Sequence, residues 1–491
     1  MGRIGHVQRL YRAEQVRELD RLAIEVHGID GYELMNRAGL RVFQTLRGRW
    51  PEARALTICC GGGNNGGDGY VVARLAREAG LNIHLIALKS PDELGGDAAR
   101  AARDWRDGGG KVESLGERFR GDVIVDAMLG TGLDRPVEGD YARLIEHVND
   151  AGRPVISVDI PSGLSADTGM PTGPCVRADA TVSFIGNKRG LFTGQAGRWC
   201  GDGIFDDLEV PGEIYETVAA DAILLTADDL RKCLPSRLPD THKGDLGHVL
   251  VIGGDHGMAG APILAGRAAL RAGSGLVSLA TRADHVHTAV AVQPELMAHG
   301  VEDLQALGNL MARADVIALG PGLGQSQWSR LLWKQALAAK QPLVLDADGL
   351  NLLTGQSVNR DHLVITPHPG EAARLLDCSA AEVQSDRFAA VRELARRYAA
   401  TVVLKGHGSL IADRDGQVCV CRHGNPAMAS AGMGDALTGL IASFLGQGLS
   451  DFDAACCGVL VHALAGDVAA RGRRQILASD LIESLNKVLP A

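Results

Sequence analysis

The sequence has few aromatic residues, no long stretch free of charge, and no concentrated run of basic side chains. Aromatic residues make up 4% of its 491 residues, and the formal net charge is −9. Without a basic run there is no track for a phosphate backbone, so we expect no nucleic-acid partner. No segment reaches ~18 uncharged apolar residues, so we expect no membrane span. The first 20 residues are charged and lack the apolar core of a secretory signal.

Cysteine is present, but not in the spacing of a redox motif. None of the ten cysteines forms a C-x-x-C pair, and most stand in apolar patterns, where a thiol behaves as a small hydrophobic group. This usage is typical of a reduced compartment, and we expect a cytoplasmic protein. The 63 glycines are typical of α/β domains with tight strand-to-helix loops. A chain of this length can form two cores of roughly 200 to 270 residues each.

Short apolar runs alternate with helical patterns in both halves, which predicts two mostly parallel sheets covered by helices. In the first half we predict two helices between Ala13 and Trp50, followed by strands at Leu56–Cys60, Asn82–Leu88, Asp122–Met128, Val155–Ile160 and Ala180–Ile185. In the second half we predict a helix at Ala261–Ala272 and strands at His248–Ile252, Leu276–Thr281, Asp315–Leu319, Leu343–Asp346, Leu363–Thr366 and Thr401–Leu404. The alternation lapses over residues 186–220, where Glu209–Glu213 has the composition of a junction. We therefore expect the domain boundary near residues 215–225.

Two glycine-rich loops, one in each half, each precede a predicted helix. The first, GGGNNGGDG at Gly61–Gly69, precedes a helix predicted at Tyr70–Ala79, and the second, Ala431–Asp435, precedes one at Ala436–Phe444. Backbone N–H groups at a helix start favour an anion. Each loop also carries an aspartate, so we expect two sites that act on phosphate-bearing molecules.

The first loop satisfies G-x-G-x-x-G, but the pattern departs from two common nucleotide motifs. A dinucleotide site adds an acidic residue at the end of the second strand, and this strand ends Leu88-Lys89-Ser90. No Gly-Lys-Ser/Thr follows, which argues against a phosphate-loop NTPase. Phosphate binding and a simple tight turn both remain open on this pattern alone. Asn64, Asn65 and Asp68 offer oxygen ligands beside the loop.

Later strand ends add further oxygen ligands. Asp126, Asp159 and Ser162 follow predicted strands, and ligands of open parallel sheets bind outside the carboxyl ends of the strands. These residues should therefore meet the first loop in one crevice. Asn65, Asp126 and Ser162 form an oxygen-only set, which suits a hard cation such as potassium or magnesium. The alternative is that each aspartate or serine only caps a turn or helix.

The motifs GGGNNGGDG, VDAMLGTGL (residues 125–133) and DIPSG (159–163) together resemble the NAD(P)H-hydrate epimerase family over about residues 10–215. The resemblance implies a Rossmann-like three-layer α/β domain that interconverts the R and S hydrates of NADH and NADPH. It implies potassium at Asn65, Asp126 and Ser162, and catalytic roles for Asp159 and Lys188. The substrate-binding residues that it implies, besides Asp159, are Asn64, Asn65, Gly66, Gly67, Asp68, Gly130, Thr131, Gly132, Leu133, Asp134, Arg135 and Pro136.

The second half resembles the ADP-dependent NAD(P)H-hydrate dehydratase family over residues 225–491. The motifs that carry the resemblance are GGDHGMAGAP (253–262), GPGLG (320–324), DADGLN (346–351), TPHPGE (366–371), KGHGS (405–409) and NPAMASAGMGD (425–435). The resemblance implies a ribokinase-like three-layer α/β domain, with the hydrate near Ala261, Gly322, His368 and Asp435. The ADP-binding residues that it implies are Lys405, Gly406, His407, Gly408, Ser409, Asn425, Met428, Ala429, Gly432 and Gly434.

Elementary chemistry supports this expectation for the second half. Hydroxide is a poor leaving group, and transfer of a phosphoryl group from ADP would improve it through positioning and charge stabilisation. Amides of Gly432–Gly434 would form the anion hole, and Asp435 could accept the hydroxyl proton. Magnesium is the expected counter-ion of the nucleotide, although no ligand for it can be named.

We therefore predict a metabolite-repair enzyme with an epimerase domain at residues 1–218 and a dehydratase domain at residues 222–491. Its expected partners are small molecules, hydrated NAD(P)H and ADP, and we expect a homo-oligomer. A ribokinase-like kinase of a small alcohol shares the Gly-x-Gly-Asp pattern and is the nearest alternative. A binding protein that keeps the first fold without activity is another, against which the intact Asp68, Asp126 and Asp159 argue.

Overall fold

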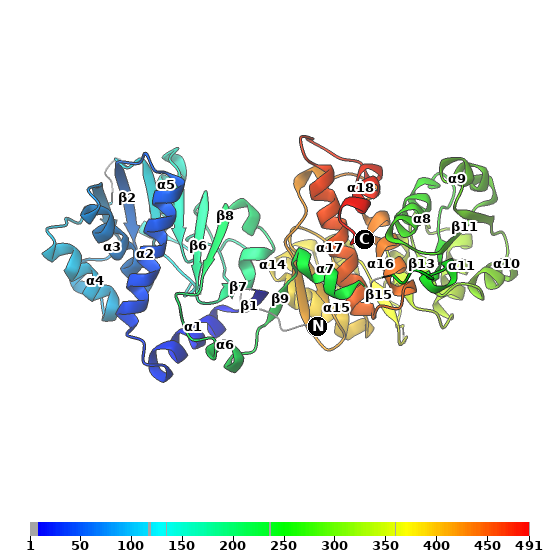
Figure 1. Cartoon of the computed structure of the whole chain (residues 1–491), viewed down its shortest axis with the longest axis horizontal. Helices are drawn as coiled ribbons and strands as arrows, with labels where there is room; N and C mark the ends of the chain where they lie inside the picture. The colour runs from blue at the N-terminus through cyan, green and yellow to red at the C-terminus, as the bar shows by residue number, and fades with distance from the viewer. Residues whose placement is uncertain (1–7, 116–118, 134, 235–236, 359, 491) are drawn as a thin grey trace. The chain divides into compact units, whose positions relative to one another are not determined.

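The computed structural model describes residues 8–115, 119–133, 135–234, 237–358 and 360–490. The chain divides into two compact units, of which the first ends at Ile223 and the second begins at Leu224. Each unit contains its own central sheet with helices around it, as Figure 1 shows. The two units are described separately below.

The first unit contains a six-stranded parallel sheet in the order β3-β2-β4-β5-β6-β8. The five predicted strands are present, each within two residues at either end; β8 was not predicted, because Asp202–Asp206 is a partly exposed edge strand rather than a buried apolar run. The strands are β2 (Ala55–Cys60), β3 (Asn82–Ala87), β4 (Val123–Ala127), β5 (Val155–Val158), β6 (Ala180–Phe184) and β8 (Asp202–Asp206).

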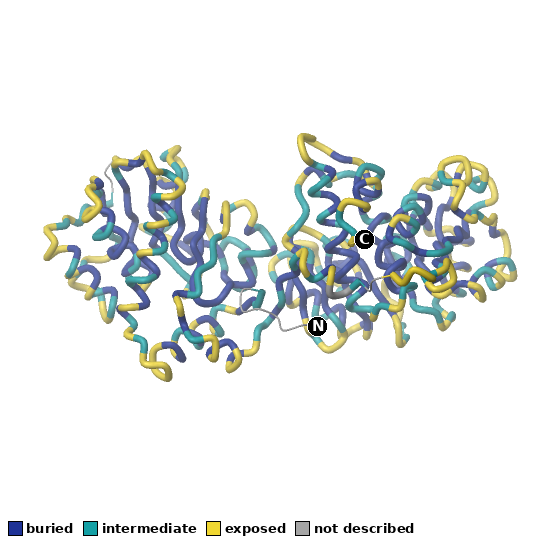
Figure 2. The backbone as a smooth tube through the Cα atoms, viewed as in Figure 1, coloured by how far each residue is buried: buried dark blue, intermediate teal, exposed yellow. Residues whose placement is uncertain are grey.

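The sheet of the first unit separates two apolar cores. Successive side chains of β2 point to opposite faces, so Ile58 and Cys60 join the core under α1 (Ala13–Arg21), α2 (Gly31–Arg49), α3 (Asn64–Glu78) and α4 (Gly96–Asp107). Cys59 joins the core under α5 (Gly139–Asp150). Figure 2 shows the buried strands between more exposed helices. This is the three-layer arrangement that the alternation predicted.

The segment expected to be a junction belongs to the first unit instead. Leu208, Val210, Ile214 and Tyr215 are buried in its larger core, so the interpretation of Glu209–Glu213 as a junction was wrong. Its Pro and Gly residues form a turn that leads into the short helix α6 (Ile214–Thr217).

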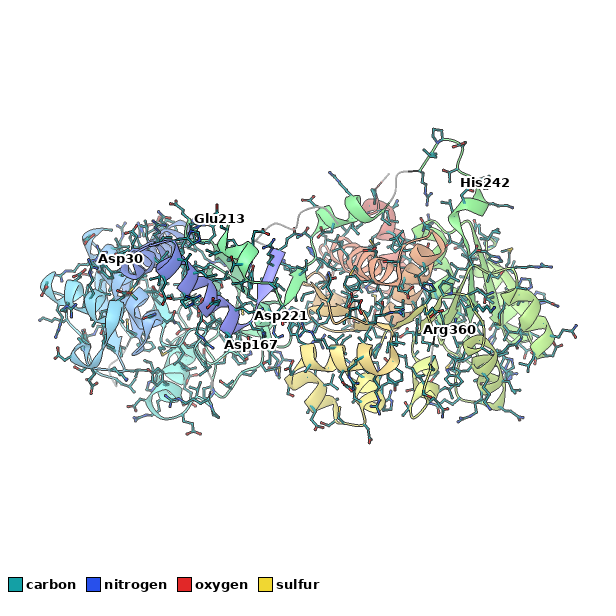
Figure 3. The ribbon with its side chains drawn as sticks, turned by 90° about the horizontal axis from the view of Figure 1, so that it is seen from below. Asp30, Asp167, Glu213, Asp221, His242 and Arg360 are labelled. Atoms are coloured by element: carbon teal, nitrogen blue, oxygen red, sulfur yellow. The ribbon has the colours of Figure 1, made fainter. Side chains whose placement is uncertain are left out.

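A small strand set continues the first unit. β1 (Arg9–Tyr11) pairs in parallel with β7 (Asn187–Lys188) and antiparallel with β9 (Ala222–Leu224). Nearby, Arg189 lies between Asp167 and Asp221, two residues labelled in Figure 3. These contacts join β1, at the start of the unit, to β7 and to β9, at its end.

The second unit contains seven parallel strands in the order β12-β11-β10-β13-β14-β15-β16, followed by the antiparallel strands β17 and β18. The six predicted strands are present; β12, β17 and β18 were missed. The strands are β10 (His248–Ile252), β11 (Leu276–Thr281), β12 (Met297–Gly300), β13 (Val316–Leu319), β14 (Leu343–Leu345), β15 (Leu363–Ile365), β16 (Thr401–Leu404), β17 (Ser409–Ala412) and β18 (Val418–Cys421).

Both glycine-rich helices begin earlier than expected. α3 begins at Asn64, so only Gly61–Gly63 form a loop, and α16 (Met433–Gly446) begins directly after Gly432. Gly66 and Gly67 are helical although glycine disfavours a helix, because a Cβ would meet Gly61 O at 2.1 Å or Met35 at 2.6 Å. Close packing therefore requires these glycines.

One helix among the described residues, α17 (Asp451–Ala469), is long and apolar enough to cross a membrane by length and composition alone. Most of it is buried, and it packs on α16 and α18 (Ala478–Ser484). Such burial is the usual property of a core helix.

Candidate active sites

A cleft of about 460 Å³ opens at the carboxyl ends of β2, β4 and β5 in the first unit. Most of the predicted residues of this half meet there. Asn64, Asn65, Asp68, Gly130, Thr131, Gly132, Leu133, Asp159 and Lys188 all line it. The open ends of parallel strands are where such a sheet binds ligands.

Asp159 and Lys188 form a buried ion pair in this cleft. Lys188 Nζ contacts Asp159 Oδ1 and also donates to Ser183 Oγ and the Phe184 carbonyl, each at 3.1 Å. The other oxygen of Asp159 accepts from the backbone and the hydroxyl of Thr131, both at 3.0 Å. Asp159 also has a positive φ of 70°, a conformation rare for residues other than glycine, asparagine and aspartate. The fold thus fixes this carboxylate firmly.

Two further carboxylates surround the pair. Asp20, on α1, lines the cleft with Asp68 and was not predicted. Burial raises the pKa of Asp20 to about 7, against the attraction of Lys188. Burial and the nearby Asp159 and Asp20 raise the pKa of Asp68 well above its usual range. The sequence did hold a signal for Asp20, because it stands four residues after the buried Val16 and so shares its helical face.

Of the proposed potassium set, Asn65 lines the cleft, whereas Asp126 and Ser162 are absent from its lining. The Asp126 carboxylate is fully buried and accepts hydrogen bonds from Ser157 Oγ at 2.8 Å and from Ser162 Oγ and N at 2.5 and 2.9 Å. Asn65 differs, because both polar atoms of its buried amide lack a hydrogen-bond partner. A buried amide without a partner is costly. A potassium ion beside the Asn65 amide oxygen would remove part of that cost, so Asn65, Asp126 and Ser162 fit a bound cation.

Not every predicted substrate residue reaches the cleft. Gly66 and Gly67 serve packing, and the exposed Arg135 and Pro136 are absent from its lining. Asp134 lies outside the described residues.

In the second unit, two glycine loops lie side by side. Gly254 N donates to Pro321 O at 3.0 Å, and Asp255 N donates to Gly322 O at 2.8 Å. Gly322 has φ +57°, and a Cβ there would stand 2.7 Å from Met258 O and 3.1 Å from Ala261 Cβ. The structure therefore brings the predicted residues Ala261 and Gly322 together.

A second cluster of charges lies at the start of α16. Lys405 Nζ is 2.7 Å from Asp346 Oδ1 and 3.7 Å from Glu371 Oε2, and Thr438 Oγ1 donates to the other oxygen of Asp346 at 2.9 Å. Burial acts to raise the pKa of Asp346, but Lys405 holds it below its usual range. Asp346 is thus a buried, ionised partner for Lys405, a role that its motif had not revealed.

Asp435 lies in the first turn of α16, near this cluster. Burial and then the charge of Asp346 raise its pKa to about 6, against the attraction of Lys405. Burial and Asp346 therefore disfavour the ionised form of Asp435 at this helix start. A Cβ at Gly434 would lie 3.4 Å from both Asp346 Oδ2 and Lys405 Nζ. The predicted anion cradle therefore adjoins the charged cluster.

The loop Lys405–Ser409 joins β16 to β17 and rests on a buried arginine. Arg387, 1% exposed, donates to the carbonyls of Leu404 and Lys405 at 3.1 and 3.4 Å and to Gln384 Oε1 at 2.8 Å. A Cβ at Gly406 would stand 3.0 Å from its guanidinium. Sequence reasoning missed Arg387, which acts from a helix 18 residues earlier in the chain.

Three further predicted residues of this half contact protein groups that hold turns and helix starts in place. His368 Nδ1 caps α13 (Pro369–Leu376) by accepting from Gly370 N and Glu371 N at 3.0 and 3.3 Å. Asn425 donates to Asp467 Oδ1 at 2.8 Å and caps the short turn at Pro426–Met428. Gly432 adopts φ +87°, which only a glycine accommodates easily, and a Cβ there would meet Leu264 at 2.6 Å. These contacts leave a ligand role for each open.

Comparison with known proteins identifies the family of each half. The family model of the NAD(P)H-hydrate dehydratase matches residues 249–487, and that of the YjeF-related protein N-terminus matches residues 31–190. A bifunctional NAD(P)H-hydrate repair enzyme of Coxiella burnetii is 46% identical over 97% of this chain and 98% of its own length. The chain belongs to the bifunctional NAD(P)H-hydrate repair enzymes. A relative from Escherichia coli with the same description is 43% identical over 98% of this chain and 94% of its own length.

Solved structures support the fold of the dehydratase half of this repair enzyme. A ribokinase-like superfamily protein of Enterococcus faecalis is 30% identical, with a TM-score of 0.52, and covers 55% of this chain and 98% of its own. A protein of Streptococcus mutans is 26% identical, with a TM-score of 0.51, over 55% of this chain and 100% of its own. The resemblance to both families and the ribokinase-like fold are thus confirmed.

Proposed function

We propose that the first unit epimerises the R and S hydrates of NADH and NADPH, and that the second dehydrates the S form with ADP, giving AMP and phosphate. The observation that carries the proposal is Asp435 at the start of α16, beside the Gly434 backbone and the Lys405–Asp346 pair. The membership of both halves in repair families supports it.

The dehydratase step needs a base, an anion cradle and a counter-charge. Asp435 accepts the proton of the substrate hydroxyl as its oxygen attacks the terminal phosphorus of ADP. A general base works best with a pKa near the operating pH, and a value of about 6 approaches that condition. The backbone at Gly432–Gly434 and the ammonium of Lys405 face the developing negative charge. The phosphorylated oxygen then leaves as phosphate, a far better leaving group than hydroxide, as the ring-nitrogen lone pair forms an iminium. Loss of a proton to water from the adjacent ring carbon then restores the carbon–carbon double bond of NAD(P)H.

The remaining predicted residues of the second unit are assigned to ADP or to the hydrated ring. The loop Lys405–Ser409 and the turn from Asn425 to Gly434 would hold ADP, and Ala261, Gly322 and His368 would hold the hydrated ring. Magnesium would neutralise the phosphates of ADP. The described residues contain no cluster of three His, Cys, Asp or Glu side chains suited to a metal, so we name no magnesium ligand.

The epimerase step follows from the chemistry of the hydrate. A dihydronicotinamide ring is an enamine, so water adds its oxygen to the carbon attached to nitrogen. The hydrate can therefore lose that hydroxyl as water and regain water on the other face of the ring. Asp159, fixed by Lys188 and Thr131, is the carboxylate placed to act on it. Potassium beside Asn65, Asp126 and Ser162 would hold the cleft in shape.

The test supplies hydrated NADH to the full-length chain and follows the near-ultraviolet absorbance of the restored dihydronicotinamide ring. With ADP we expect both the R and the S hydrate to be converted back to NADH. Parallel samples with ATP and without nucleotide test the nucleotide requirement. No recovery with either nucleotide, together with phosphorylation of small alcohols, would favour the kinase alternative. Cytoplasmic location and homo-oligomerisation stay predictions, for which cell fractionation and light scattering are the measurements.

A further inference from the structure

Asp20 is a carboxylate of the epimerase cleft that was not among the predicted residues. It stands near the end of α1, lines the cleft, and interacts with Lys188 and Asp159. Across the described ranges of the chain, no hydrogen bond to its carboxylate is present. Asp159, in contrast, is held by Lys188 and Thr131. Asp159 is therefore held in place by its partners, whereas Asp20 is free to meet a ligand.

We propose that Asp20 is a further catalytic residue of the epimerase, which carries the proton that the leaving hydroxyl needs. This inference rests on the proposed function of the first unit. It assigns separate tasks to two carboxylates that come from different elements, α1 and the end of β5. Asp159, paired with Lys188, stabilises the positive ring, while Asp20 exchanges the proton.

The step balances without another reactant. Asp20, as a carboxylic acid, gives its proton to the hydroxyl, and the carbon–oxygen bond breaks to release water. The lone pair of the ring nitrogen forms a double bond to that carbon, so a cationic iminium replaces the hydrate. Water then adds to the other face of the ring, and the proton that it loses returns a carboxylate to its acid form.

The surroundings of Asp20 keep its carboxyl in the needed state. The groups around it are Asp68 on α3, Asp159 after β5, Lys188 on β7, Arg17 on α1, Asp97 on α4 and, by charge interaction, Tyr215 on α6. Burial raises the pKa of Asp20 to about 7, so about half of the molecules carry the acid at neutral pH. Lys188 is already paired with Asp159, so its positive charge is shared between the two carboxylates and only partly offsets the effect of burial on Asp20.

The test compares Asp20→Asn with Asp20→Glu in the full-length chain. Asparagine keeps the size but cannot donate a carboxyl proton, so epimerisation should fall about 10²- to 10⁴-fold in kcat. Glutamate restores the acid and should recover much of that loss. The wild-type rate should decline as the pH rises through about 7, and this decline should disappear in Asp20→Asn. Glu14→Gln, which removes an exposed carboxylate from the same helix, should leave the rate unchanged.

Thermal unfolding of the fragment that ends at Ile223 serves as the folding control for the first unit, and dehydration of pure S hydrate checks that the second unit is unaffected. If Asp20→Asn epimerises within about threefold of wild type, or raises only KM while the pH profile is unchanged, Asp20 is a wall of the cleft and the inference is overturned. If wild type itself does not epimerise, the proposed function fails instead. An equal loss in Asp20→Asn and Asp20→Glu, with dehydration intact, would also contradict a proton-carrying role.

Discussion

Replacement of Asp435 by asparagine should separate the catalytic role of this residue from its structural one. Asparagine keeps the shape of the side chain but cannot accept a proton at neutral pH. We expect dehydration of S hydrate to fall about 10²- to 10⁴-fold, the usual effect of losing a general base. ADP should still bind, because the cradle is mainly backbone, and epimerisation should be unaffected. The assays are the single-turnover dehydration rate and the ADP dissociation constant.

The pKa of Asp435 adds a second, quantitative expectation. The rise from 3.8 to about 6 corresponds to at most about 3 kcal/mol. Because the pKa of Asp435 is higher in the folded state than in the unfolded state, its protonated carboxyl stabilises the fold below about pH 3.8. This contribution to the free energy of unfolding is lost as the pH rises through about 6. The wild-type fold therefore carries the cost of an ionised Asp435 at neutral pH, and asparagine does not. Asp435→Asn should be more stable than wild type near pH 7.5, with little difference near pH 4.

The activity of wild type should follow the same ionisation. Near pH 5 about a tenth of Asp435 would be ionised, so the dehydration rate should fall about tenfold from its plateau. A rate drop of less than tenfold in Asp435→Asn, or a flat pH profile down to pH 5, would refute the assignment of Asp435 as base. Loss of ADP binding along with the rate would instead give it a structural or ionic role.

Three other predictions concern the first unit. Asp126→Ala should lower epimerisation and its dependence on potassium, tested with tetramethylammonium as the replacement ion, and leave dehydration nearly unchanged; equal losses in both activities would contradict separate domains. Lys188→Met leaves Asp159 buried without its cation and should cost about 3–5 kcal/mol of stability as well as epimerisation, and an unchanged melting temperature would argue against the pair. Fragments divided between residues 218 and 222 should each be soluble and active. A first fragment that ends at Ile223 should have a higher melting temperature than one that ends at residue 218, because it keeps Asp221 beside the buried Arg189 and the pairing of Ala222 with Leu10. Equal melting temperatures would show that these contacts contribute little.

The sequence predicted what local pattern determines. Buried β-branched runs such as Val249–Ile252 predicted their strands, because such runs are typical of parallel sheets. The edge strand Asp202–Asp206 and the hairpin of β17 and β18 lacked that pattern. The start of α3 at Asn64 was missed because three glycines in its first two turns oppose helix formation, and close packing against Gly61 and Met35 overrides that preference.

The candidate sites were predicted to the extent that motifs carry them. Residues of one motif, such as Asn64–Asp68, were recognised from their order in the chain. Asp20 and Arg387 belong to no motif, and their roles depend on distant partners. The spacing of Asp20 from Val16 indicated a shared helical face but not the cleft that this face meets. The raised pKa of Asp435 also depends on a distant partner, because Asp346 stands 89 residues earlier in the chain and lies near Asp435 only in the folded protein.

The buried Arg387 has a thermodynamic consequence for nucleotide recognition. A glycine-rich loop normally loses conformational entropy when a ligand orders it, and that loss weakens binding. Here the carbonyls of Leu404 and Lys405 are held by the guanidinium, and Gly406 closes over it. The loop is therefore pre-organised, so the ADP binding proposed for it would lose little affinity to the ordering of the loop.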